Sequence, residues 1–140
     1  MNVDVNWLAV LVAAVVAMAI GFIYYSKVVM GKAWMKEKGY TDESLKAAQK
    51  TMGPLYAISF VAALVTAFVL AHIIGLSQDF YGYEPIQTGL ISAFWVWLGF
   101  IMPVQLTEQI FGEKKWRLFG INTVHQLITV LAMGVVIGWL

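Results

Sequence analysis

The sequence predicts an all-α integral membrane protein, a four-transmembrane-helix bundle that forms one domain over residues 1–140. Two observations predict this class. The chain is 61% hydrophobic and 12% charged, which is more apolar surface than a soluble domain of this size can bury. Its apolar residues also gather into four runs, each long enough to cross a hydrocarbon core about 30 Å thick. Most of the chain is therefore expected to face lipid or another helix.

The four runs cover approximately residues 7–25, 54–76, 85–107 and 118–140. Asn6 can cap the first run, and Pro54 and Pro85 open the second and third, where a missing backbone N–H is harmless. Pro103 lies inside the third run and predicts a kink, because it removes a backbone hydrogen bond. Between the first two runs, the segment from Thr41 predicts a short cytoplasmic surface helix.

The basic residues decide the expected threading. All nine lie in the loops that follow the first and third runs: Lys27, Lys32, Lys36, Lys38, Lys46, Lys50, Lys114, Lys115 and Arg117. Because Lys and Arg favour cytoplasmic loops, we expect both termini on the outer face. Aromatic belts agree, with Trp7, Tyr81, Tyr83 and Trp139 outside and Tyr24, Tyr25, Trp34, Tyr56 and Trp116 inside.

Small residues recur at every fourth position and predict close helix packing in the bilayer. They are Ala9, Ala13, Ala17 and Gly21 in the first run, Ser59, Ala63, Ala67 and Ala71 in the second, and Gly134 and Gly138 in the fourth. These faces serve packing within one chain or between copies. We expect a homo-oligomer, most simply a homodimer, in the lipid bilayer.

Polar side chains at membrane depth are the candidate ligand-binding residues. Folding the third and fourth runs back near Gly112 brings Gln105 and Glu108 to the depth of Asn122, His125 and Gln126. Two interpretations stay open. The cluster either forms interhelical hydrogen bonds that fix packing, or it holds a small solute, proton or ion that enters from the cytoplasm.

Several function classes are not favoured. The chain has no Cys, no catalytic motif, no metal-ligand spacing and no Arg-rich segment for nucleic acid. We therefore expect no enzyme activity, metal or cofactor, and no nucleic-acid partner. The sequence favours binding or transport of a small solute or ion. The alternative is a structural or interaction protein that docks an unknown membrane partner or self-associates through its small-residue faces.

A set of short segments resembles the domain of unknown function 1761 family. In order, they are Gly21-Phe22-Ile23-Tyr24-Tyr25-Ser26, Gly31-Lys32-Ala33-Trp34-Met35, Trp97-Leu98-Gly99-Phe100, Phe111-Gly112, Ile121-Asn122, Met133-Gly134 and Gly138-Trp139. The resemblance implies a small four-helix protein of the bacterial cytoplasmic (inner) membrane and implies no activity. Members often carry Trp-Tyr at the place of Tyr24-Tyr25 and an aromatic-His pair over His125-Gln126. Asn122 fits the family pattern better than His125 does.

Overall fold

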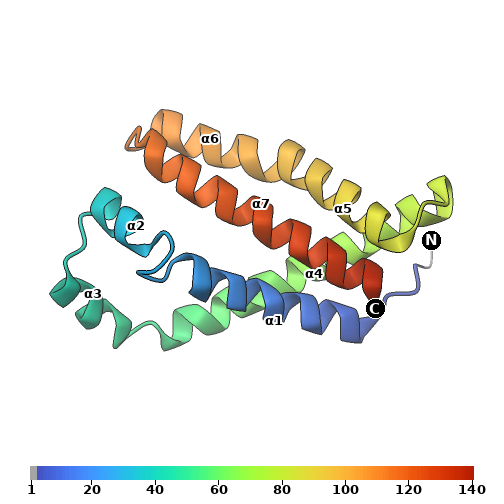
Figure 1. Cartoon of the computed structure of the whole chain (residues 1–140), viewed down its shortest axis with the longest axis horizontal. Coiled ribbons are helices and arrows are strands. Elements are labelled where there is room, and N and C mark those ends of the chain that lie inside the picture. The colour runs from blue at the N-terminus through green and yellow to red at the C-terminus, as the bar shows by residue number, and fades with distance from the viewer. Residues whose placement is uncertain (1–2) are drawn as a thin grey trace.

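The computed structural model describes residues 3–140, and within them every regular element is a helix. Four long helical segments dominate: α1 (Trp7–Tyr24), α4 (Gly53–Tyr81), the segment Pro85–Phe111, and α7 (Trp116–Trp139). Each is long and apolar enough to span a membrane. They correspond to the four runs expected from the sequence and lie side by side along the molecule (Figure 1).

Capping residues set the ends of these helices. The Asn6 side chain accepts a hydrogen bond from the Ala9 backbone N–H and so caps α1. Pro54 stands in the first turn of α4, as expected. At its other end α4 continues past residue 76 to Tyr81, because Gly82 adopts a left-handed φ of 66° and ends the helix there.

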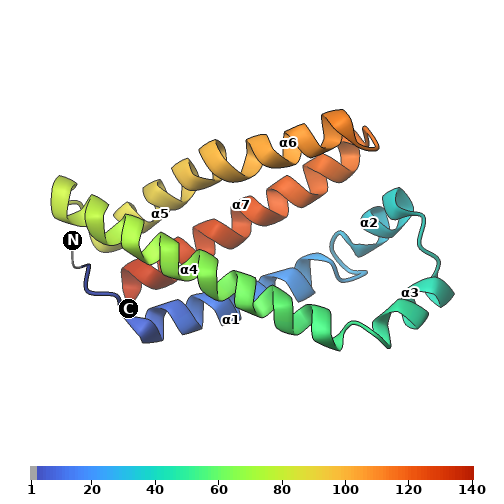
Figure 2. The same ribbon diagram turned by 180° about the vertical axis from the view of Figure 1, so that it is seen from behind.

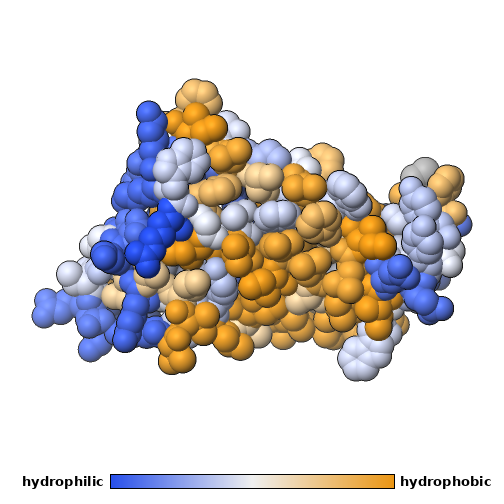
Figure 3. Space-filling model, turned by 45° about the horizontal axis from the view of Figure 1, so that its top comes forward, coloured by the Kyte–Doolittle hydropathy of each residue, from blue (hydrophilic) through white to orange (hydrophobic). Residues whose placement is uncertain are grey.

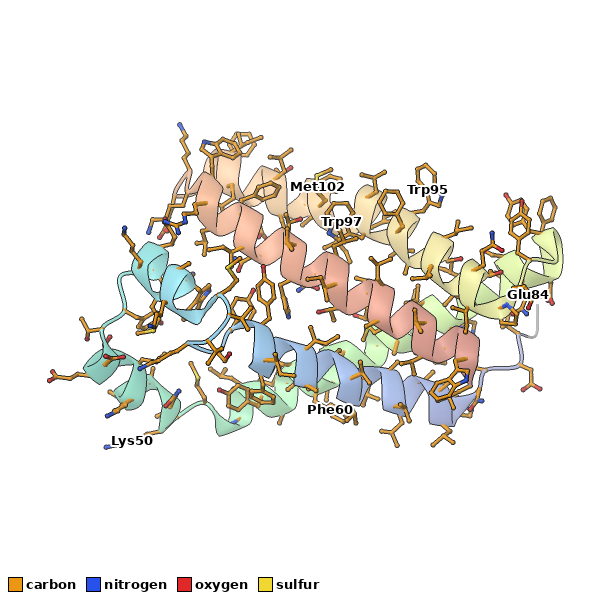
Figure 4. The ribbon with its side chains drawn as sticks, in the orientation of Figure 1. Lys50, Phe60, Glu84, Trp95, Trp97 and Met102 are labelled. Carbon is orange, nitrogen blue, oxygen red and sulfur yellow. The ribbon has the colours of Figure 1, made fainter. Side chains whose placement is uncertain are left out.

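The third long segment consists of α5 (Pro85–Val96), a π-helical stretch η1 (Trp97–Ile101) and α6 (Met102–Phe111). The Met102 backbone N–H donates to the carbonyl of Trp97 in the π pattern, immediately before Pro103. The kink expected at Pro103 stays a prediction. Trp97 turns toward α7, where its indole N–H donates to the carbonyl of Thr123 at 3.0 Å, whereas Trp95 points outward (Figure 4).

Two short helices connect α1 to α4: α2 (Gly31–Lys38) and α3 (Asp42–Gln49). Thr41 caps α3 through a reciprocal capping box with Ser44, at the start expected from the sequence. The sequence reasoning did not predict α2. Lys27 donates a hydrogen bond to Asp42 and holds the pKa of that exposed carboxyl below its usual value.

The core lies where α1, α4, α5 and α7 meet. Val10, Ala13 and Ala17 of α1 pack with Leu70 of α4 and with buried residues of α7 such as Val130 and Met133. Among the small residues expected to pack, Ala9, Ala13, Ala17, Ala67, Ala71 and Gly134 are buried, Gly21, Ala63 and Gly138 are half-buried, and Ser59 is exposed.

The helix pair α5–α7 makes the closest approach. A Cβ on Gly89 would overlap the backbone carbonyl of Gly134, a Cβ on Gly134 would overlap that of Gly89, and a Cβ on Gly138 would overlap that of Pro85. Glycine is therefore required for the two backbones to touch, in the way that small residues allow in membrane helices.

The two ends of the molecule differ in charge. Both termini lie at one end, where the Asn6 side-chain amide donates to the Leu140 carbonyl at 3.1 Å (Figures 1 and 2). The basic loops lie at the other, hereafter the lysine end, with Lys50 and Glu84 at opposite ends of the molecule (Figure 4). An apolar belt separates the two polar ends (Figure 3).

Candidate functional site

A partly open cavity of about 870 Å³ lies between α1, α4 and α7 toward the lysine end. Much of its wall is apolar, with Met18 and Phe22 from α1, Ala62 and Ala63 from α4, and Met133 from α7. The short helices α2 and α3 border it through Trp34, Lys38, Leu45 and Gln49. The cavity therefore extends from the charged loops into the apolar belt.

One side of the cavity, hereafter the polar wall, consists of Asn122, His125, Gln126 and Thr129 of α7 together with Tyr25. The α7 residues follow helical spacing, so they share one face of that helix. The Tyr25 hydroxyl donates to Asn122 Oδ1 at 2.8 Å. The His125 ring lies against Tyr25, with centroids 4.8 Å apart, and its Nε2 is 3.3 Å from Thr129 Oγ1.

The polar wall keeps hydrogen-bonding groups to spare. Within residues 3–140, the hydrogen bonds leave Asn122 Nδ2, His125 Nδ1 and the Gln126 side-chain amide without a protein partner. Nearby, Gln105 Oε1 is buried without a partner. Polar groups in apolar surroundings carry a free-energy cost unless they are hydrogen-bonded. Water or a bound molecule in the cavity would supply the missing partners.

The structure brings four of the five sequence-predicted site residues together. Gln105, Asn122, His125 and Gln126 all line the cavity. Glu108 does not: it lies one turn further along α6, toward the lysine end, where it is exposed. For a carboxylate near the end of an apolar helix, the free-energy cost of reaching water is lower than that of burial in a cavity wall. This difference accounts for the position of Glu108.

Aromatic residues at the site were assigned by sequence reasoning to the inner aromatic belt alone. In the structure, Tyr25 and Trp34 line the cavity, and the Tyr24 hydroxyl donates to the Ile121 carbonyl at 2.8 Å. Trp97 reaches the Thr123 carbonyl of the same helix. Two aromatic donors from different helices thus hold the segment of α7 that carries Asn122. The sequence does contain a signal for these contacts: the pair Tyr24-Tyr25 is expected at the same membrane depth as the polar first turns of the fourth run.

Ion pairs and a hydrogen bond connect α2 with the turn before α7 and the first residues of α7 at the lysine end. Lys115 pairs with Glu113 at 3.0 Å and donates to the Glu37 carbonyl at 2.7 Å, while Arg117 lies 3.8 Å from the Glu37 carboxylate. The hydrogen bond from Lys115 lowers the pKa of the exposed Glu113 carboxyl. Among residues 3–140, Lys38 is the charged residue on the lining, and no Asp or Glu lines the cavity.

The Tyr24 hydrogen bond gives a testable stability effect. Tyr24→Phe removes the buried donor to the Ile121 carbonyl, and we expect the free energy of unfolding to fall by roughly 1 kcal/mol. Titration with SDS in mixed micelles measures this change. Tyr56→Phe is the matched control, because that exposed hydroxyl contacts the sulfur of Met52, 3.4 Å away. Equal losses in both variants would contradict the prediction.

Residues 8–138 match the model of a family described as protein of unknown function (DUF1761). The chain belongs to this family. The match includes the four long segments except Trp7 and Trp139 at their outer ends, and it includes the whole polar wall, so the cavity lies within the part of the chain that defines the DUF1761 family. No curated protein and no solved structure matches the chain. The family description names no activity, and function is therefore argued from the cavity.

Proposed function

We propose that this DUF1761 member binds a small amphipathic solute in its cavity, which opens toward the cytoplasm. The observation that supports this most is the polar wall, whose unused hydrogen-bonding groups face a space of about 870 Å³ that also has many apolar lining residues. Small-molecule sites in proteins have this size and this composition, with a few polar groups that orient the ligand within an apolar enclosure.

The lining supports a solute rather than a divalent metal such as Ca²⁺. Sites for such metals are built largely from carboxylates, and the lining residues of the described chain include no Asp or Glu. The amides of Asn122 and Gln126 and the ring of His125 instead suit a hydroxyl, carbonyl or amide group. Transport of this solute would require the cavity to open toward the termini as well.

The competing proposal is a structural protein that docks a partner or self-associates through its small-residue faces. Ala13, Ala17, Ala67 and Ala71 are buried within the chain itself, so a homodimer would have to use other surfaces. The homodimer stays a prediction. Our proposal keeps the bacterial inner membrane and outward termini, which rest on the basic residues of the lysine end.

Cysteine labelling tests the cavity, because the chain contains no Cys of its own. Ser59→Cys places a thiol on the lining, and Val61→Cys places one on the exposed apolar face of the same helix. In phosphatidylcholine nanodiscs, we expect a neutral, water-soluble maleimide to react with the S59C thiol and not with the V61C thiol, since thiolates form in water. Added decanol is expected to slow the reaction of S59C saturably.

Two results would count against the proposal. An unreactive S59C thiol in folded protein would mean that water does not enter the cavity. A reactive thiol that decanol never protects would leave a wet cavity without the expected amphipathic ligand. Thermal unfolding of both variants checks that the comparison is made between folded proteins.

A further inference from the structure

Lys38 gives the lining of the cavity a positive charge, and from this charge we infer that the solute is an amphipathic anion. Its negatively charged head would lie near Lys38, and its apolar body would extend between α1, α4 and α7. This inference rests on the proposed function, because it names the substrate class of the same cavity.

The surrounding charges leave Lys38 available. Glu113 pairs with Lys115, and Glu37 is close to Arg117, so each of these two carboxylates has a cation of its own. Lys38 adds a smaller electrostatic contribution to the lowered pKa of Glu113 without forming an ion pair with it. Asp42 pairs with Lys27. Among the ion pairs within residues 3–140, none includes Lys38. The lining therefore carries the ammonium of Lys38 and, among the described residues, no carboxylate.

The cavity is elongated and polar toward one end. Its lining on α4 extends from Met52 to Thr66, about 21 Å at 1.5 Å per residue. Lys38 and Gln49 lie at the lysine end of this length, and Met133 lies at the deep end. A molecule with one charged head and an extended apolar body matches this order of side chains, whereas a compact ion would leave the apolar part empty.

The position of Lys38 makes the expected preference measurable. Lys38 is an exposed residue of the lining, and a hydrogen bond from its ammonium to an anionic head is stronger than one between neutral groups. We expect an anionic ligand to bind about tenfold or more tightly than a neutral one of equal chain length, which is the scale of one charge-assisted hydrogen bond.

Decanesulfonate and decanol provide the matched pair of probes, since the sulfonate stays ionised at neutral pH. The readout is the concentration, per bilayer lipid, at which each probe halves the maleimide reaction rate of S59C in phosphatidylcholine nanodiscs. We expect the sulfonate to protect at a concentration about tenfold lower. Lys38→Gln in the S59C background should bring the two concentrations close to each other. Lys46→Gln, on α3 and outside the lining, should leave the preference unchanged.

The outcomes separate this inference from the proposed function. Equal protection by both probes in the parent, or a sulfonate preference that survives Lys38→Gln, would overturn the anion inference and leave solute binding intact. Protection by neither probe would overturn both. A preference lost equally in Lys38→Gln and Lys46→Gln would assign the effect to general surface charge and would also overturn the role of Lys38.

A second arm distinguishes a soluble anion from an anionic lipid, which share the same chemistry. Nanodiscs that contain phosphatidylglycerol are compared with phosphatidylcholine alone, at constant ionic strength. If the lipid itself occupies the cavity, the S59C thiol is already protected in the phosphatidylglycerol discs, and Lys38→Gln restores its reactivity. If a free anion is the ligand, lipid composition leaves the basal rate unchanged. A basal rate that falls without any dependence on Lys38 would contradict both sources.

Discussion

Replacing Gly134 by Leu is expected to push α5 and α7 apart and to lower the free energy of unfolding by about 3 kcal/mol or more. Even the Cβ of the new side chain would overlap the carbonyl of Gly89, and it would lie 3.0 Å from the Cβ of Ala93. These contacts involve backbone atoms in the most closely packed helix pair, so rotamer changes cannot relieve them. SDS titration and thermal unfolding measure the loss.

Gly120→Leu is the matched control for Gly134→Leu. Both glycines belong to α7, but a Cβ on Gly120 meets no atom within 4 Å. Leu favours helix over Gly by somewhat less than 1 kcal/mol, so this variant is expected to be neutral or slightly stabilised. Comparable losses in the two variants would show that close α5–α7 contact is not what Gly134 provides.

Gly21→Phe is expected to weaken protection of the S59C thiol by decanol while leaving the protein folded. Gly21 lines the cavity, and a Cβ there would stand at ordinary contact distance, 3.6 Å, from His125 Nε2. A ring at this position would lie over the polar wall and occupy part of the cavity. We expect the decanol concentration for half-protection to rise at least about tenfold, because both apolar contact area and hydrogen bonds are lost.

Two control variants for Gly21→Phe distinguish occupation of the cavity by the ring from a general loss of protein stability. Gly21→Ala adds a methyl group that the site can accept, so it should keep decanol protection and raise stability slightly through helix propensity. Gly120→Phe adds the same ring to open space on α7 and should also keep protection. Normal protection in Gly21→Phe with an unchanged melting temperature would contradict the assignment of the polar wall as the ligand site.

The helices could be predicted from the sequence because the bilayer imposes a length and an apolar composition on them. The common location of both termini followed from the distribution of lysines and from the number of spans, and the Asn6–Leu140 hydrogen bond agrees with it. The sequence reasoning ended α4 at residue 76, because the hydropathy of the chain decreases there although the helix continues. Residues 77–81 are more polar, yet the helix continues until Gly82 ends it.

The sequence predicted part of the site. The part that it did not predict depends on which helices lie next to each other in space. Spacing along α7 placed Asn122, His125 and Gln126 on one face, but it could not show which neighbour that face meets. The sequence reasoning paired this face with the third run. The structure brings Gln105 of that run to the same cavity, and it also opens the face toward α1 and α4, where Tyr25 contacts Asn122. The lining residues that α2 and α3 contribute depend on how the polar segment between α1 and α4 folds back over the cavity. The periodicity of the sequence does not determine that arrangement.

The length of α4 connects this architecture to the thickness of the membrane. At 29 residues it extends about 43 Å, and its apolar part, residues 54–76, extends about 35 Å, somewhat more than a hydrocarbon core of about 30 Å; it also crosses the other helices obliquely (Figure 2). Hydrophobic mismatch of this kind is relieved by tilting or by local thickening of the lipid. Because α4 supplies a long wall of the cavity, any change in its tilt also changes the cavity width. Bilayer thickness would then tune ligand affinity without a change in any side chain.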